Sequence, residues 1–325
     1  MSEHPYAHLT PDKVMAAVES LGYLCDARLL ALNSYENRVY QVGIEDNEPL
    51  IAKFYRPDRW SLEQIKEEHQ FSFELAEADI SVVAPMLDRH GESLHKYAGF
   101  HFALFERRGG YPPELDNLNS LFVLGRTLGR IHSVAKSKKF KHRMQLDIQG
   151  FAIDSYQLIV EHFIPKNLQI AYRSLCEHLI TAIEKKYKPS TDDLIRVHGD
   201  CHVGNILWRD QVAHFVDLDD CIRAPAVQDI WMLLSGERQQ QSIQLNEILE
   251  GYTEFSDFKA AQLNWIESLR TMRIMHYSAW LAKRWNDPAF PKAFPWFNSE
   301  RYWSDHILEL REQLALIEEP PLELY

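Results

Sequence analysis

The chain has 325 residues, of which 46% are hydrophobic and 25% are charged, as is ordinary for a globular protein. Its 47 acidic residues outnumber 35 Lys and Arg and give a net charge of −12, which argues against a general binder of nucleic acid or of anionic membranes. No apolar run is long enough to span a bilayer, and the polar N-terminus does not resemble a signal peptide. The four cysteines form no CxxC pair, so we expect a reduced, cytoplasmic protein.

The first hundred or so residues alternate between helical and β-like segments. Thr10-Pro11-Asp12 is typical of a helix start. A capping-box pattern at Ser61-Leu62-Glu63-Gln64 predicts a helix that runs to about Ala78. Strands are expected over residues 28–32, 39–44, 50–55, 81–85 and 99–105. These segments predict a small lobe that is mostly antiparallel sheet with one main helix.

Helical spacing dominates after Gly109-Gly110. Apolar residues between 121 and 135 follow one helical face, another amphipathic helix is expected over 172–187, and most segments beyond 229 have helical character. Two short apolar strands, over 194–198 and 214–218, interrupt this pattern. We therefore expect an α+β fold with a small N-terminal lobe and a large, mostly helical C-terminal lobe.

Polar side chains follow both short strands. His198-Gly199-Asp200-Cys201-His202-Val203-Gly204-Asn205 begins where the first strand ends, and Asp217 lies at the end of the second. Asn205 and Asp217 offer the hard oxygen ligands that Mg²⁺ prefers, and Asp200 can take a proton from an acceptor hydroxyl. Protein kinases have the same five-residue spacing between base and metal-binding amide. The pattern predicts phosphoryl transfer with Asp200 and Asp217 as catalytic residues; the alternative is a purely structural Asp-rich turn.

A kinase also needs a phosphate-binding lysine on its third strand. Lys53 lies in the apolar segment 50–55, where a charge is otherwise out of place. Such a lysine pairs with a carboxylate on the following helix. Glu68 shares a helical face with Ile65 and Leu75 and is expected to point toward the sheet, but the adjacent Glu67 stays open.

The loop between the first two strands is expected to cover the phosphates of a nucleotide. Aligning Val39 with the Val of G-x-G-x-x-G-x-V puts Ser34 and Asn37 at the second and third glycine positions. The glycines are missing, so an ordinary polar hairpin is the alternative. Phe105-Glu106 falls where a hinge between lobes would bind adenine. We therefore expect a nucleotide-binding lobe over residues 1–107 and a catalytic and substrate lobe over 108–325.

The HGDxHxxN block with the later aspartate resembles the aminoglycoside phosphotransferase/choline kinase superfamily, whose two-lobed fold is similar to that of protein kinases. Leu32–Tyr40 (LNSYENRVY), Val197–Asp220 and the aromatic stretch Trp280–Trp303 are similar to the bacterial stress response kinase A family. The similarity runs from about residue 9 to the C-terminus. It implies a cytoplasmic, monomeric Ser/Thr protein kinase that uses ATP and Mg²⁺ in a stress response.

Carried over by motif, the resemblance implies that Asp200 accepts the proton, Asn205 and Asp217 bind magnesium, Ser34 contacts ATP and Lys53 binds phosphate. One departure from ordinary protein kinases is that Gln228 follows Asp217 by only eleven residues, without an A-P-E motif. No room is left for a long activation loop. A kinase for a small amino alcohol, sugar or antibiotic therefore stays open. A nucleotide-binding pseudokinase that docks a partner is a further alternative, although no catalytic position is missing.

Three features outside this core have two interpretations each. The aromatic and proline-rich stretch 276–303 either lines an acceptor groove or packs the helical lobe. Lys136–Arg143 (KSKKFKHR) is either a solvated loop or a docking segment. Arg270, Arg273 and Arg284 either face an acidic substrate or form surface ion pairs.

Overall fold

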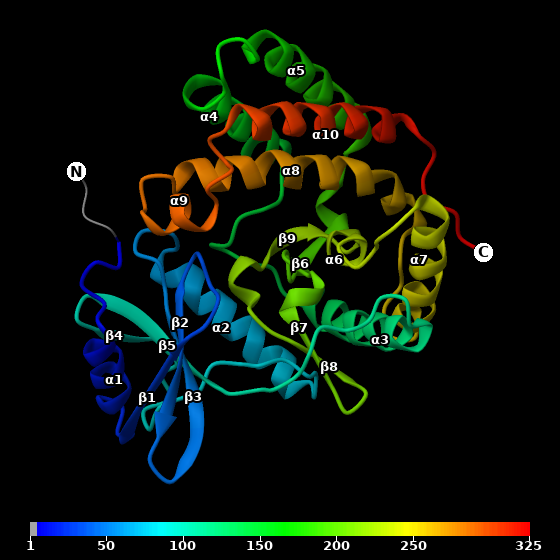
Figure 1. Cartoon of the computed structure of the whole chain (residues 1–325). Helices are drawn as coiled ribbons and strands as arrows, with labels where there is room; N and C mark the ends of the chain where they lie inside the picture. Colours follow the sequence, from blue (N-terminus) through cyan, green and yellow to red (C-terminus); the bar gives the residue numbers. More distant parts are fainter. Residues whose placement is uncertain (1–4) are drawn as a thin grey trace.

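The computed structural model describes residues 5–325 and has two lobes (Figure 1). Within these residues the smaller lobe holds a five-stranded antiparallel sheet in the order β1-β2-β3-β5-β4. Its strands are β1 (Cys25–Ala31), β2 (Arg38–Ile44), β3 (Asn47–Phe54), β4 (His95–Tyr97) and β5 (Phe100–Glu106). Lys53 pairs in register with Val39 on one side and Ala103 on the other, so it lies on the central strand.

Helices cover both faces of this sheet. Helix α1 (Pro11–Glu19) packs against alternate residues of β3 and β5, such as Phe54 and Phe102. Helix α2 (Leu62–Glu77) packs on the other alternate set, where Ile65 meets Ala103. Ser61 and Gln64 exchange both hydrogen bonds of a capping box, which confirms the predicted start of α2. The position of α2 therefore follows from a cap and an apolar face that are both readable in the sequence.

The expected strand over residues 81–85 is wrong. This segment makes only single bridges, from Val82 to Phe215 of the larger lobe and from Pro85 to Phe105 of the smaller one. Because these contacts go to different lobes, the segment cannot form a continuous ladder, and Pro85 has no N–H to donate. The further strand of the sheet is β4 instead.

The larger lobe is mainly helical, as the sequence predicts. Its two short hairpin-like sheets pair β6 with β9 and β7 with β8, all antiparallel. Its helices enclose one continuous apolar core. The strands are β6 (Leu194–Val197), β7 (Ile206–Arg209), β8 (Val212–Phe215) and β9 (Ile222–Pro225), and the helices are α3 (Leu118–Ala135), α4 (Asp154–His162), α5 (Gln169–Lys186), α6 (Val227–Trp231), α7 (Arg238–Thr253), α8 (Ile266–Lys283), α9 (Ala289–Ala293) and α10 (Glu300–Glu318).

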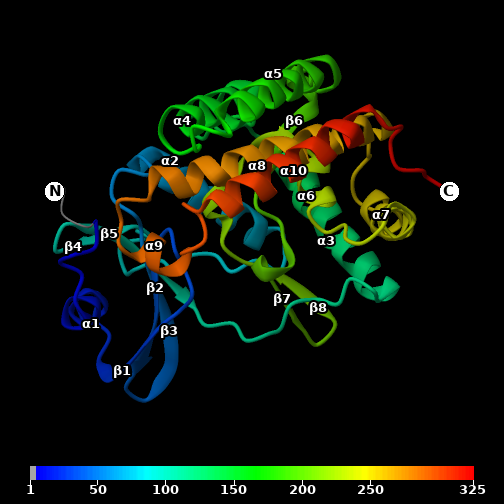
Figure 2. The same ribbon diagram turned by 45° about the horizontal axis from the view of Figure 1, so that its top comes forward.

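Helix α8 and the short helix α9 bring the larger lobe over the smaller one. Figures 1 and 2 both show α9 beside the part of the smaller lobe where β2 begins. In Figure 1, helices α4, α5 and α10 lie above α8, on the side away from the sheet. Within residues 5–325, no helix has the length and apolar character needed to cross a membrane.

Candidate active site

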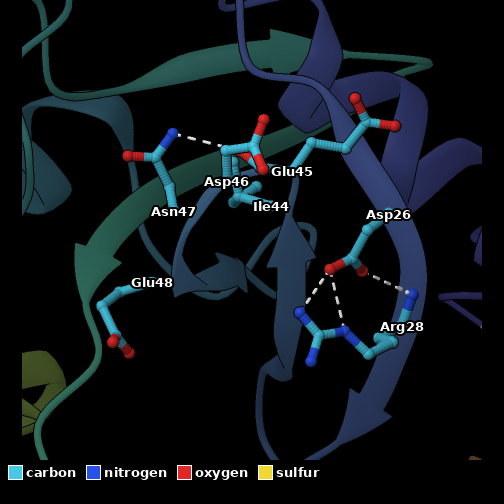
Figure 3. Close-up of a pocket in the computed structure, with 7 residues that line it drawn as sticks. All are labelled: Asp26, Arg28, Ile44, Glu45, Asp46, Asn47 and Glu48. Atoms are coloured by element: carbon cyan, nitrogen blue, oxygen red, sulfur yellow. Dashed lines mark hydrogen bonds and ion pairs between the residues drawn. The ribbon is translucent and has the colours of Figure 1, made fainter.

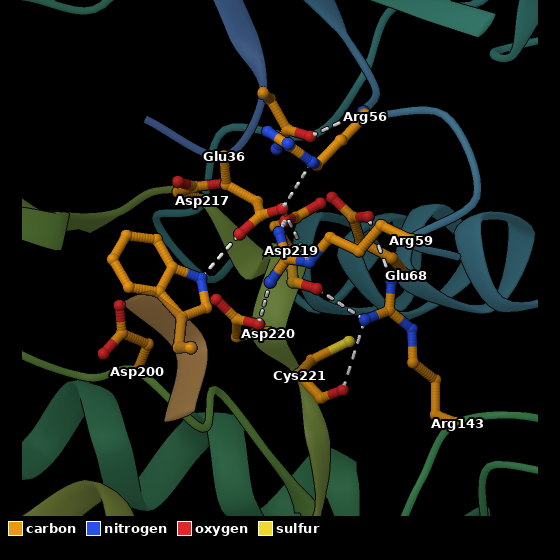
Figure 4. Close-up of polar contacts among 12 residues, drawn as sticks. Glu36, Arg56, Arg59, Glu68, Arg143, Asp200, Asp217, Asp219, Asp220 and Cys221 are labelled. Atoms are coloured by element: carbon orange, nitrogen blue, oxygen red, sulfur yellow. Dashed lines mark hydrogen bonds and ion pairs between the residues drawn. The ribbon is translucent and has the colours of Figure 1, made fainter. Parts of the chain in front are cut away.

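Three carboxylates surround the ammonium group of Lys53 between the lobes. Lys53 Nζ lies 2.9 Å from Asp217 Oδ1, 3.2 Å from Asp219 Oδ1 and 3.3 Å from Glu68 Oε1. Burial by itself would lower the pKa of Lys53, but the charges of Asp217, Asp219 and Glu68 outweigh it and hold the pKa well above its usual value. The lysine is therefore a fixed positive charge next to the predicted metal ligand Asp217. Figure 4 shows the acidic side chains gathered at this point.

The two acids that the sequence left open on α2 have different partners. Glu68 is buried and joins Lys53 to Arg143, whose Nη2 lies 3.1 Å from Glu68 Oε2. Glu67 instead accepts hydrogen bonds from the backbone N–H groups of residues 141, 142 and 143, at 2.6–2.9 Å. The basic segment 136–143 is mostly exposed, as expected for a solvated loop, and its last three residues join α2 to the larger lobe.

Asp200 lies in the loop after β6 with its carboxylate already oriented. Asn205 Nδ2 donates to the carbonyl oxygen of Asp200 at 2.9 Å and lies 3.3 Å from its Oδ2. Arg273 Nη2 on α8 lies 2.5 Å from Oδ1. Burial raises the pKa of Asp200, but the hydrogen bond from His202 and the charge of Arg273 outweigh it and bring the pKa below its usual value. The carboxylate is therefore ionised and able to accept a proton.

Asp229 of α6 fixes the start of the loop that carries Asp200. Its carboxylate accepts hydrogen bonds from the backbone N–H groups of His198 and Gly199, at 2.8 and 2.9 Å. His132 Nε2 lies 3.0 Å from Asp229 Oδ2. Gly199 has φ +83°, and a Cβ there would lie 2.3 Å from the carbonyl oxygen of Asp220. This close approach explains why glycine stands where protein kinases have arginine.

Asn205 and Asp217 have the donor chemistry for one Mg²⁺. The amide nitrogen of Asn205 is engaged by Asp200, which leaves its oxygen available for a cation. Asp217 has φ +58° and a side chain that is 50% exposed, so its carboxylate reaches open space. Among the described residues, no group of three His, Cys, Asp or Glu side chains could hold a metal by itself. Two oxygen ligands from the protein are compatible with Mg²⁺, which completes its shell with phosphates and water.

The remaining residues predicted from the sequence lie around this cluster with different exposures. Asn37 is buried: its side chain accepts the backbone N–H of Arg56 at 3.1 Å and donates to Asp219. Ser34 is partly buried in the loop between β1 and β2. Glu106 lies at the end of β5, where its exposed carboxylate is 3.5 Å from Arg108. In the described part of the chain, no hydrogen bond or ion pair joins Ser34 or Glu106 to the Lys53 cluster.

Sequence reasoning missed several arginines that organise the site. Arg59, in the turn before α2, forms ion pairs with Asp219 and Asp220. Burial raises the pKa of Asp219, but the charges of Arg59 and Lys53 outweigh it and hold the pKa well below its usual value. Arg143 and Arg273 were visible only as members of basic or helical stretches. Nothing in the residues next to these arginines indicates which acidic side chains they contact in the folded chain.

The aromatic stretch 276–303 mostly packs the larger lobe. Phe290, Phe297 and Trp303 are fully buried, whereas Tyr277 and Trp296 are 43% and 42% exposed. A surface hollow of the smaller lobe lies elsewhere, around the turn between β2 and β3 (Figure 3). It is lined by exposed acidic side chains and the Asp26–Arg28 ion pair, and holds none of the residues discussed above.

Comparisons with known proteins agree with this fold. Residues 28–263 match the family described as phosphotransferase enzyme family. Stress response kinase A of Escherichia coli K12 is 43% identical over 324 residues, which cover 99% of this chain and 98% of the relative. The Salmonella typhimurium protein called serine/threonine protein kinase RdoA is 43% identical over 317 residues, covering 97% and 96% of the two chains.

Solved structures of small-molecule kinases have the same fold. An amicoumacin kinase in complex with AMP-PNP, Ca²⁺ and its antibiotic superposes with a TM-score of 0.73 at 21% identity, covering 96% of this chain and 95% of the other. A microcompartment-associated aminopropanol kinase superposes with a TM-score of 0.70 at 18% identity, covering 93% and 95%. The fold and the matched region define a phosphotransferase with kinase-like lobes. More narrowly, the chain belongs to the stress response kinase A family.

Proposed function

We propose that this kinase transfers the γ-phosphoryl group of MgATP to Ser or Thr hydroxyls of proteins. The hydroxyl of the acceptor donates its proton to Asp200. Asn205 and Asp217 hold Mg²⁺, which neutralises the charge of the phosphates when it is bound. Lys53, oriented by Glu68, contacts the phosphates, and the β1–β2 loop with Ser34 and Asn37 covers them. The backbone at Glu106 binds adenine at the hinge, within a nucleotide-binding lobe that ends near residue 107.

The main support for this proposal is that Lys53 forms ion pairs with both Asp217 and Glu68. A lysine that lies 2.9 Å from one carboxylate and 3.3 Å from another, on the central strand, has the partners that a phosphate-binding kinase lysine needs. Arg273 keeps Asp200 ionised nearby. The name of the Salmonella relative supports a Ser/Thr protein acceptor.

A small-molecule acceptor is the second candidate. It is favoured by the short connection between Asp217 and Gln228, because ordinary protein kinases use a longer segment there to dock peptides. The amicoumacin and aminopropanol kinases, which share the fold, are named for small acceptors. Both candidates use the same phosphoryl-transfer chemistry and differ only in the molecule that carries the hydroxyl.

The test uses the purified full chain, γ-labelled ATP, Mg²⁺ and an extract of the source cells, with products separated into protein and small-molecule fractions. We expect label on protein Ser or Thr. Asp200→Ala should lower the transfer by at least about 10², the scale of general-base assistance, while the nucleotide still binds. Label confined to a small molecule would select the second candidate. Absence of transfer to either fraction, with ATP bound, would favour a docking pseudokinase.

A further inference from the structure

The carboxylate of Glu36, in the β1–β2 loop, is buried among donors from distant parts of the chain. Its side chain is 11% exposed. Trp280 Nε1 donates to Glu36 Oε2 at 2.6 Å, and Arg284 Nε lies 2.5 Å from the same oxygen. Arg56 Nε and Arg59 Nε each lie 3.7 Å from Oε1. Figure 4 shows Arg56 and Arg59 on the side of the smaller lobe. A carboxylate that is this deeply buried is costly unless cations and N–H donors surround it, as they do here.

Trp280 lies on the face of α8 that also contacts Asp200, and Arg284 is the residue that caps the C-terminal end of this helix. Positions 273, 280 and 284 are separated by seven and four residues, close to two turns and one turn of a helix, so they share one face. Arg273 Nη2 lies 2.5 Å from Asp200 Oδ1. At a rise of 1.5 Å per residue, about 10 Å of helix separates the Asp200 contact from the first Glu36 contact. One rigid helix therefore sets the spacing between the loop that carries Asp200 and the β1–β2 loop.

The β1–β2 loop is held by side chains at successive positions, and it contains no glycine. The ring of Tyr35 packs against Phe294 with centroids 4.8 Å apart, and Phe294 packs against Trp280 at 6.0 Å. The next residue is Glu36, and Asn37 accepts the backbone N–H of Arg56. The contacts of residues 35 and 36 hold the loop to α8 and to Phe294 after α9, and the contact of residue 37 holds it to its own lobe.

We propose that Glu36 is a positioning residue for the nucleotide. Docked on Trp280 and Arg284, it fixes the β1–β2 loop at the distance from Asp200 that the phosphates of ATP require. Glu36 acts through the loop that carries Ser34 and does not touch the nucleotide itself. The proposal rests on the proposed function, because it assigns this loop to the phosphates of ATP. It accounts for a nucleotide loop that works without the usual glycines.

The experiment compares two conservative variants with the wild-type full chain. Glu36→Gln keeps the size of the side chain and an oxygen that can accept from Trp280, but removes the charge that faces Arg56, Arg59 and Arg284. Trp280→Phe keeps an aromatic ring but removes the N–H donor and part of the ring surface that packs against Phe290 and Phe294. For each protein we would measure the affinity for AMP-PNP with Mg²⁺, the KM for ATP, the KM for the acceptor, kcat and the melting temperature.

We expect each variant to bind AMP-PNP about tenfold more weakly, because an undocked loop reduces the fraction of binding-competent molecules. The KM for ATP should rise in parallel, and the KM for the acceptor should not change. The double variant should bind about as weakly as the weaker single variant, because both changes release the same loop from α8. Glu45→Gln and Lys283→Met remove exposed charges from the smaller lobe and from α8, respectively, and should match the wild type.

Two outcomes would overturn this proposal while leaving the proposed function intact. In one, the wild type binds AMP-PNP and both variants bind it equally well. In the other, kcat and both KM values change together with the melting temperature, which would indicate a merely structural contact. Failure of the wild type itself to bind AMP-PNP would instead contradict the proposed function, and the positioning role with it.

Discussion

Arg273 places a guanidinium nitrogen 2.5 Å from Asp200 Oδ1, although 73 positions separate the two residues. The arginine lies on α8, outside the loop that carries Asp200, and its side chain is 41% exposed. The other oxygen of Asp200 is contacted by Asn205 and His202. The carboxylate is therefore held from two sides, and the contact from Arg273 lies outside the HGDxHxxN motif.

Arg273→Met removes this contact while keeping an unbranched side chain on α8. We expect kcat to fall about tenfold, because a charge-assisted hydrogen bond contributes roughly 1.5–3 kcal/mol to holding its partner. The affinity for ATP should not change, since Arg273 faces the base rather than the nucleotide. Steady-state kinetics with saturating ATP would measure the effect, and Arg273→Lys should restore part of it. An unchanged kcat in Arg273→Met would show that Asp200 is positioned by its own loop alone.

The two adjacent acids of α2 provide a matched pair of variants. Glu68→Gln removes the one carboxylate that Lys53 and Arg143 share, and we expect kcat to fall at least about 10². Glu67→Gln weakens hydrogen bonds to the 141–143 backbone, which should lower the melting temperature by about 2–4 °C and leave kcat near the wild-type value. Kinetics and thermal melts of both proteins would distinguish the roles. A loss of kcat in Glu67→Gln but not in Glu68→Gln would show that Glu67, rather than Glu68, is the acid that supports Lys53 in the reaction.

Gly199→Ala tests the close approach between the loop that carries Asp200 and the backbone of Asp220. A Cβ at this position would meet the carbonyl oxygen of Asp220 at 2.3 Å, and φ is +83°. We expect a loss of about 2 kcal/mol or more in the free energy of unfolding and a large drop in kcat, because Asp200 must shift. Gly22→Ala is the control: φ is +96° there, but nothing lies within 4 Å. It should cost about 1 kcal/mol and leave kcat unchanged; equal kinetic losses in both variants would argue against the clash.

His69 makes the stability of the smaller lobe depend on pH. Its Nε2 lies 2.7 Å from the Tyr55 hydroxyl and its Nδ1 lies 2.8 Å from Ser93 Oγ. Burial, and then the charge of Lys53, lowers the pKa of His69 to about 3. In the unfolded chain this pKa is about 6.5, so below pH 6.5 only the unfolded state takes up the proton. The free energy of unfolding should therefore fall by about 2 kcal/mol at pH 5 from this group.

Urea unfolding at pH 7.5 and pH 5 would measure this dependence. His69→Gln should remove about 2 kcal/mol of the difference between the two pH values, because glutamine does not titrate. The exposed His90→Gln should leave the difference as it is in the wild type. If His69→Gln showed the full wild-type dependence, other groups would have to account for it.

Much of the fold was predictable because its signals are local. The capping box at Ser61 and Gln64, the apolar faces of the helices and the short strand before His198 all depend on neighbours within a few residues. The segment 81–85 was mispredicted because its apolar composition is that of a strand, whereas its partners lie in two different lobes. The composition of a segment indicates whether its backbone prefers to be extended. It does not indicate whether a neighbouring strand is free to pair with it.

The candidate site divides in the same way. Asp200, Asn205 and Asp217 form a motif with fixed spacing, so the types and order of these residues are enough to point to phosphoryl transfer. Lys53 is recognisable as a charge inside an apolar strand. The choice between Glu67 and Glu68 was not available from spacing, because neighbouring helix positions differ by only about 100°. The way α2 packs between the two lobes turns Glu68 toward Lys53 and Glu67 toward the backbone of residues 141–143.

The order of the lobes, the helix caps and the acid and amide residues of the HGDxHxxN block can be read from the chain alone, because each depends on short-range spacing and polarity. Which charges neutralise one another depends instead on contacts between distant parts of the chain. Arg59 meets Asp219 across 160 positions, and Trp280 reaches Glu36 across 244. Such long-range pairs produce no regular spacing of residues that could be recognised in the sequence. They form because a buried carboxylate must find a cation or an N–H wherever the folded backbone brings one within reach.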